Sequence, residues 1–138
     1  MYNEKIAGGG FHHIAMKVYD LDATLKFYKE GLGFKHVNAW KHPDGSPDGT
    51  MLESGDGAIF EFFPGGEKEQ PTGALIHIAL KTDDCDKAMA AAVQAGGVVT
   101  MEPTSLVIKG DMEDVPVRIA FFKGINGEVI EFFQIRKV

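Results

Sequence analysis

The stretch Phe11-His12-His13-Ile14-Ala15-Met16-Lys17-Val18 decides the fold, because it returns as Leu75-Ile76-His77-Ile78-Ala79-Leu80-Lys81-Thr82. The second copy follows the first by 64 residues, and at that spacing His13 falls on His77. The agreement continues past this stretch, since seven positions between 13 and 35 are identical in the two copies. Self-similarity at a fixed spacing indicates an internal repeat.

A second pair of matching segments lies at the end of the two halves of the repeat. Residues 57–63 read GAIFEFF, and residues 127–133 read GEVIEFF, so that Glu61 falls on Glu131. Large apolar residues flank both carboxylates, and an ionised group in such a strand is costly unless a partner neutralises it. Each half therefore begins with a histidine strand and ends with a glutamate strand.

The residue pattern predicts the same order of elements twice. Alternating polarity predicts a strand at 11–18, with His13, Ala15 and Lys17 on one face and with His12 on the other as a structural residue. A helix is expected from Asp20 to Leu32. The remaining expected elements are strands at 34–40, 50–54 and 58–63, then a strand at 75–82, a helix at 84–95, and strands at 98–101, 117–122 and 128–135.

The predicted fold class is therefore α+β, with two βαβββ modules in tandem that form a half-open barrel of mixed and antiparallel strands around a metal site. The modules cover about residues 11–63 and 74–135, the linker is 64–73, and 11–138 form a single domain behind a flexible arm at 1–10. Residues 109–114 account for the extra length of the second module, as a longer turn or as a lid.

Composition excludes several functions. The net charge is −6, and no basic run offers a surface for nucleic acid. No apolar stretch approaches the roughly 20 residues that a membrane helix needs. The single cysteine, Cys85, cannot form an internal disulfide and is expected to be a small packed residue, so a cytoplasmic location is expected.

The matched histidines and glutamates predict a metal site. A lone histidine on a strand is usually an ordinary polar residue, but here two imidazoles and two carboxylates stand at equivalent repeat positions. Two carboxylates balance the charge of one divalent cation, and this ligand set suits Ni, Zn, Co, Mn or Fe. A closed four-coordinate site would be structural, and an octahedral one with open positions would be catalytic.

These residues resemble the vicinal oxygen chelate superfamily, which includes glyoxalase I, methylmalonyl-CoA epimerase, extradiol dioxygenases and bleomycin-resistance proteins. The resemblance spans about residues 11–135, and His13, Glu61, His77 and Glu131 match the four-ligand pattern of glyoxalase I. The short separation of Glu61 from His77 is similar to that of compact bacterial glyoxalase I. The motifs that carry the resemblance are residues 11–18, Asp20-Leu21, Phe27-Tyr28, Leu32-Gly33-Phe34 and Asn126-Gly127 before Val129-Ile130-Glu131-Phe132.

The resemblance implies a metal-dependent lyase that isomerises the hemithioacetal of methylglyoxal and glutathione, or another thiol, through an enediolate. Glu131, with Glu61 as its partner, would move the proton, and Lys17 and Arg118 would bind substrate carboxylates. The chain has only two arginines, where glyoxalase I uses several. An epimerase or dioxygenase on a small oxygenated substrate, or a drug-binding protein without catalysis, therefore stays an alternative.

The resemblance also implies a homodimer that acts on a small molecule. Whether the metal site lies within one chain or between two is left open by the sequence.

Overall fold

The computed structural model describes residues 1–71 and 73–137. Thr72 of the predicted linker and Val138 at the end of the predicted domain lie outside the described residues. The first module is a four-stranded sheet in the order β1-β4-β3-β2, in which β1 runs parallel to β4 and the other pairs are antiparallel. Its elements are β1 (His13–Val18), α1 (Leu21–Lys26), β2 (Lys35–Lys41), β3 (Pro47–Gly55) and β4 (Ala58–Pro64).

The second module repeats this topology with the sheet order β5-β8-β7-β6, and again its first and last strands are parallel. Asp20 and Asp84 cap the two helices at equivalent positions, each through a side-chain oxygen that accepts a backbone N–H. The elements are β5 (Ile78–Lys81), α2 (Cys85–Gln94), β6 (Val98–Ile108), β7 (Val115–Lys123) and β8 (Val129–Ile135). The predicted α+β fold class, with two βαβββ modules in tandem, is confirmed.

Several element boundaries differ from the sequence prediction. The first helix continues beyond α1 as a π-helical turn, η2 (Phe27–Gly31). β5 begins only at Ile78, whose register partner in β8 is Ile130, so residues 75–77 lie outside the strand. β6 runs to Ile108, since register shifts on both sides of Met101 accommodate Pro103 within the strand.

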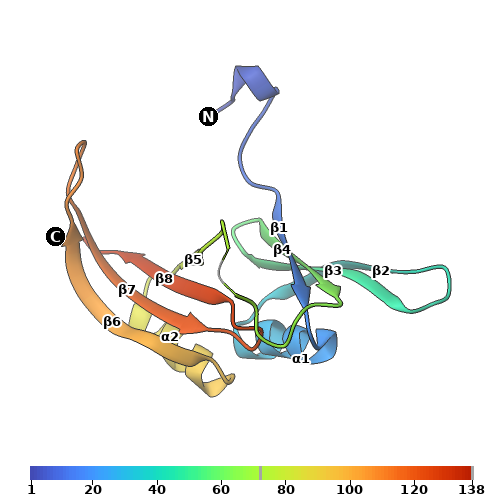
Figure 1. Ribbon diagram of the computed structural model, residues 1–138. Helices are drawn as coiled ribbons and strands as arrows, with labels where there is room; N and C mark the ends of the chain where they lie inside the picture. Colours follow the sequence, from blue (N-terminus) through green and yellow to red (C-terminus); the bar gives the residue numbers. More distant parts are fainter. Residues whose placement is uncertain (72, 138) are drawn as a thin grey trace.

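Residues 109–114 form the turn between β6 and β7, and the Nζ atom of Lys109 lies 2.8 Å from Oδ2 of Asp114 across this turn. Near the N-terminus, a short 3-10 helix, η1 (Glu4–Ile6), precedes β1. In Figure 1 this arm extends away from the rest of the chain.

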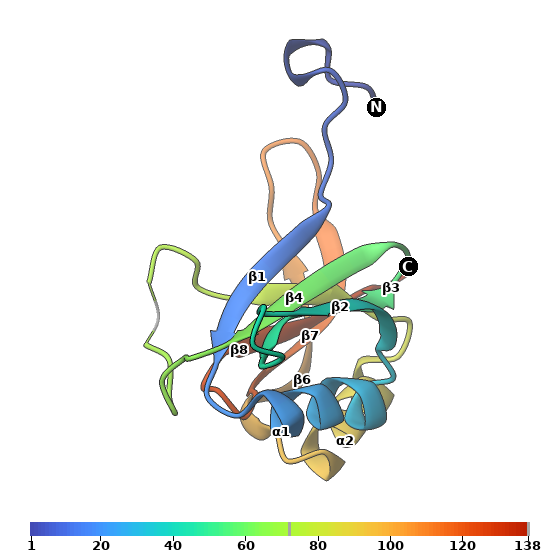
Figure 2. The same cartoon turned by 90° about the vertical axis from the view of Figure 1, so that its right-hand side faces the viewer.

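One apolar core serves both modules. Figures 1 and 2 show α1 and α2 on the same side of the two sheets, and the buried cluster lies between these helices and the sheet faces that they cover. Phe27, Phe60 and Phe62 of the first module belong to the same cluster as Phe122 and Phe132 of the second. In the described part of the chain, no helix is both long and apolar enough to cross a membrane.

A polar junction also connects the modules. Asn126, in the turn before β8, is buried; its Oδ1 accepts the backbone N–H of Tyr19 at 3.1 Å, and its Nδ2 donates to Oγ1 of Thr24 at 3.1 Å. Its backbone carbonyl accepts the N–H of Gln70, which fastens the linker to the same turn. Buried polar groups need such partners, so these contacts fix one module against the other.

Candidate functional site

The first His–Glu pair lies on the face of its sheet that α1 does not cover. In β1, Ile14, Met16 and Val18 are the more buried residues, so His13 points to the open face. Ala15 is the register partner of Glu61, and its small side chain leaves space beside the carboxylate. The Nε2 atom of His13 lies 3.7 Å from Oε1 of Glu61; the histidine side chain is 38% exposed and the glutamate side chain 10%.

The second pair repeats this arrangement. Ala79 is the register partner of Glu131, as Ala15 is of Glu61. The Nε2 atom of His77 lies 3.2 Å from Oε1 of Glu131, and these side chains are 32% and 9% exposed. The ring of Phe121 packs edge-on against His77 with centroids 5.4 Å apart. We call each His–Glu pair a half-site.

Burial makes the Glu131 carboxylate unusually basic. Desolvation raises its pKa above the ordinary glutamate value, while the charge of His77 and a hydrogen bond from it act in the opposite direction. A carboxylate that is paired only with an imidazole in such a place is suited to bind a cation or to take up a proton.

The two half-sites of one chain do not merge into a single site. Among residues 1–71 and 73–137, no cluster of three or more His, Cys, Asp or Glu side chains is close enough to hold a metal ion. The donor set nevertheless fits a divalent cation, because two imidazole nitrogens and two carboxylates would supply four ligands and two balancing charges.

The predicted substrate-binding residues lie in different places. Lys17 lies on the open face of β1, in line with His13, and its side chain is exposed. Arg118 lies on the opposite, helix-covered side of its sheet, where Nε and Nη2 donate to the two carboxylate oxygens of Asp86 at 2.7 and 2.8 Å. Asp86 belongs to α2, so Arg118 connects sheet and helix and is not brought together with the half-sites.

His12 was expected on the face opposite His13, but the structure places the two rings in contact. β1 begins only at His13, so strand alternation does not extend to His12. The two Nδ1 atoms are 2.8 Å apart. The sequence signal for this contact is the His-His doublet itself, because the equivalent doublet in the second half is Ile76-His77.

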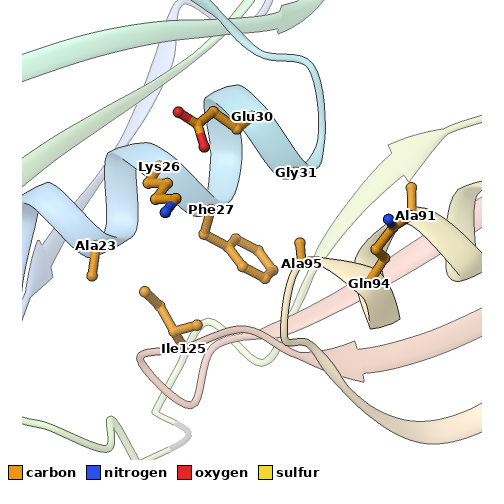
Figure 3. A pocket seen from close by; sticks show the side chains of 9 residues that line it. All are labelled: Ala23, Lys26, Phe27, Glu30, Gly31, Ala91, Gln94, Ala95 and Ile125. Carbon is orange, nitrogen blue, oxygen red and sulfur yellow. The ribbon is translucent and has the colours of Figure 1, made fainter.

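The grooves in the surface do not all belong to this site. A groove of about 590 Å³ lies between α1 and α2, on the helix side, and none of its lining residues belongs to a half-site (Figure 3). A smaller pocket of about 150 Å³ is lined by His77 of the second module together with Ile14, Ala15 and Met16 of β1. His77 therefore faces a hollow to which both modules contribute.

Comparisons with known proteins agree with this architecture. A probable lactoylglutathione lyase of Vibrio parahaemolyticus is 31% identical over 134 residues, covering 94% of this chain and 93% of that protein. A glyoxalase/dioxygenase structure from Nostoc punctiforme matches with a TM-score of 0.69 at 20% identity, over 93% of this chain and 92% of that one.

The antibiotic-binding protein TnmS3 of a Streptomyces species matches with a TM-score of 0.66 at 22% identity, over 93% of this chain and 97% of that one. These two structural matches show a shared fold. The family model that describes the Glyoxalase/Bleomycin resistance protein/Dioxygenase superfamily matches residues 10–132. The chain therefore belongs to the Glyoxalase/Bleomycin resistance protein/Dioxygenase superfamily.

Proposed function

We propose that this protein is a metal-dependent lyase of the glyoxalase I type, acting on a hemithioacetal of methylglyoxal. The observation that carries the proposal is the pair of half-sites, each an imidazole beside a buried carboxylate at equivalent positions of the repeat. The name of the Vibrio relative, which is similar over nearly its whole length, supports the same reaction class.

The complete site would take one half-site from each of two chains. His13 and Glu61 of one copy, with His77 and Glu131 of a second copy, would hold one divalent ion, and a homodimer would contain two such sites. This arrangement is supported by the separation of the half-sites among the described residues of a single chain. When bound, the ion supplies positive charge that stabilises negative charge developing on the substrate oxygens.

The two carboxylates would carry out the proton transfer. In the isomerisation, a proton leaves the carbon that carries sulfur and returns to the neighbouring carbonyl carbon, while the hydroxyl proton passes between the two oxygens. Glu131 would be the base, with Glu61 as its partner, because burial raises the pKa of Glu131 and a more basic carboxylate accepts a carbon-bound proton more readily. Lys17 would bind a substrate carboxylate from the open face of β1.

Metal content and activity test this proposal. The wild-type protein reloaded with Ni, Co or Zn should convert the methylglyoxal–glutathione hemithioacetal, and Glu61→Gln and Glu131→Gln should each lose bound metal and turnover. Absence of bound metal in the wild type, or absence of turnover with all three ions and with several thiols, would overturn the proposal.

A mixed dimer tests the shared site directly. If the sites lie between chains, a dimer of one Glu61→Gln chain and one Glu131→Gln chain has one damaged and one intact site, so co-expression with two affinity tags should restore about half of the wild-type metal content. If each site lies within one chain, both sites of the mixed dimer remain damaged and nothing is restored.

A second candidate is another metal-dependent enzyme of the superfamily that acts on a small oxygenated substrate. The binding of Arg118 to Asp86 favours it, because this guanidinium is engaged on the helix side and not at the half-sites. Oxygen uptake with a catechol and Fe(II), without conversion of any hemithioacetal, would establish this alternative.

A further inference from the structure

The starting observation is the contact between two adjacent imidazoles. Nδ1 of His12 and Nδ1 of His13 are 2.8 Å apart, and the rings meet edge to face at an interplanar angle of 82°. At this distance two neutral imidazoles share one proton, so one Nδ1 donates and the other accepts. The direction of this hydrogen bond fixes the tautomer of His13.

The other nitrogen of His13 indicates that direction. Its Nε2 lies 3.7 Å from Oε1 of Glu61, which is beyond the length of a hydrogen bond, so Nε2 has no need to carry a proton. In the second half-site, Nε2 of His77 lies 3.2 Å from Oε1 of Glu131, where a proton on Nε2 can be donated. The two half-sites therefore differ in which histidine nitrogen makes the close contact.

We propose that His12 is a positioning residue for His13. Nδ1 of His12 accepts the Nδ1 proton of His13, holds the ring in place, and leaves the lone pair of Nε2 directed to the open face for a metal ion. Metal-binding histidines commonly donate their second ring N–H to such an outer partner, which fixes tautomer and orientation. This inference rests on the proposed function, in which His13 is a metal ligand.

The repeat provides an internal comparison. The residue equivalent to His12 is Ile76, which is exposed. The side chain of Ile76 has no group that could accept a hydrogen bond from His77. The second copy of the strand therefore lacks a hydrogen-bond acceptor at this position, and His12 distinguishes one half-site from the other. Substitutions at 12 and 76 form a matched pair, because both residues are exposed and both precede a proposed ligand.

The first measurement is the tautomer of His13 in the metal-free protein, from the ¹⁵N chemical shifts of its ring. The wild type should show a proton on Nδ1. His12→Phe keeps an aromatic ring but removes the acceptor, and it should shift His13 toward the Nε2-protonated form. His12→Asn returns an acceptor oxygen and should restore the wild-type tautomer, while Ile76→Ala should leave it unchanged.

The second measurement is the Kd for zinc, obtained by competition with a chromophoric chelator. His12→Phe should weaken zinc binding roughly 10-fold, at the lower end of the range for outer partners because His12 is exposed. His12→Asn should recover most of this loss, and Ile76→Ala should bind zinc within about twofold of the wild type. Circular dichroism and thermal melting establish that all variants are folded.

Each outcome is decisive. An unchanged His13 tautomer in His12→Phe overturns the inference, and so does an unchanged Kd, while the proposed function stands if the wild type binds zinc. A weakened Kd that His12→Asn does not restore also overturns it, because the loss would then not come from the missing acceptor atom. A wild type that binds none of zinc, nickel and cobalt overturns the proposed function, and the tautomer of the metal-free protein still decides whether His12 accepts from His13.

Discussion

The phenol of Tyr28 in the first module donates a hydrogen bond of 2.9 Å to Oε2 of Glu128 in the second. Tyr28 is fully buried, and Oε1 of Glu128 accepts the backbone N–H of Asn126 at 2.9 Å. The carboxylate thus holds the turn before β8 and the helix of the other module together. The directions in which the two half-sites face depend on this junction.

Removal of the Tyr28 hydroxyl should weaken the junction. Hydrogen bonds to charged groups contribute about 1.5–3 kcal/mol, so Tyr28→Phe should lower the free energy of unfolding by about that amount, as measured by urea denaturation. Tyr19→Phe is the matched control, because the Tyr19 side chain is 60% exposed. Equal stability of the two variants would show that the Tyr28–Glu128 bond does not connect the modules.

The same tyrosine should make the stability of the protein depend on pH in the alkaline range. Burial first, and the nearby negative charge of Glu128 second, raise the pKa of Tyr28 well above the ordinary value of about 10. Above that value the unfolded chain releases the phenol proton while the folded chain retains it, so stability falls as pH rises. Urea titrations between about pH 9 and pH 11 should show this fall in the wild type and a shallower one in Tyr28→Phe.

The contact between the helices leaves no space for a side chain at Gly31. A Cβ atom built on Gly31 would overlap with Cβ of Ala95, next to the groove of Figure 3. Gly31→Ala should therefore destabilise the protein by about 1–3 kcal/mol through overpacking, measured by thermal or urea unfolding. Gly73→Ala is the control, since among the described residues nothing beyond its chain neighbours lies within 4 Å of an added Cβ there; similar effects of both variants would contradict the close packing.

Arg118 should contribute to structure and not to metal binding. Its guanidinium donates to Asp86 of α2 and to Oγ of Ser105, on the side of the sheet away from the half-sites. Arg118→Met should lower the melting temperature and leave the Kd for zinc within about twofold of the wild type. Asp86→Asn should have a similar effect, and the double variant should add little. A large loss of zinc affinity in Arg118→Met would contradict this placement.

Replacement of Glu131 should have opposite effects on the stability of the metal-free protein and on the binding of metal. Burial raises the pKa of its carboxyl, so at neutral pH the charged form makes the metal-free folded state less stable. This cost is relieved as pH falls through the raised pKa. Metal-free Glu131→Gln should therefore melt at or above the wild-type temperature at pH 7, and zinc should stabilise the wild type but not the variant. A clearly lower melting temperature of the metal-free variant would contradict this account.

The repeat predicted the same order of elements in both modules, and strand alternation assigned His13, Ala15 and Lys17 to one face. The sequence did not predict where strands end. β5 begins later than predicted, at Ile78, and β6 extends to Ile108 because register shifts accommodate Pro103; both boundaries depend on a paired strand that is distant in sequence.

The sequence predicts the candidate site only in part. Alternation identifies the half-sites, since Glu61 and Glu131 are anomalous in apolar strands. It does not determine how one module lies relative to the other, and so it could not show that the four side chains remain as two pairs in one chain. The positive charge of Arg118 predicts substrate binding, but only its contact with Asp86 shows that it lies on the helix-covered face of the sheet.

The shared core makes each copy of the repeat dependent on the other. Phe27 of one copy and Phe122 of the other pack at 6.3 Å between ring centroids, so the deletion of either copy would leave the survivor with an apolar surface in water. A stand-alone module would therefore need polar side chains at these positions.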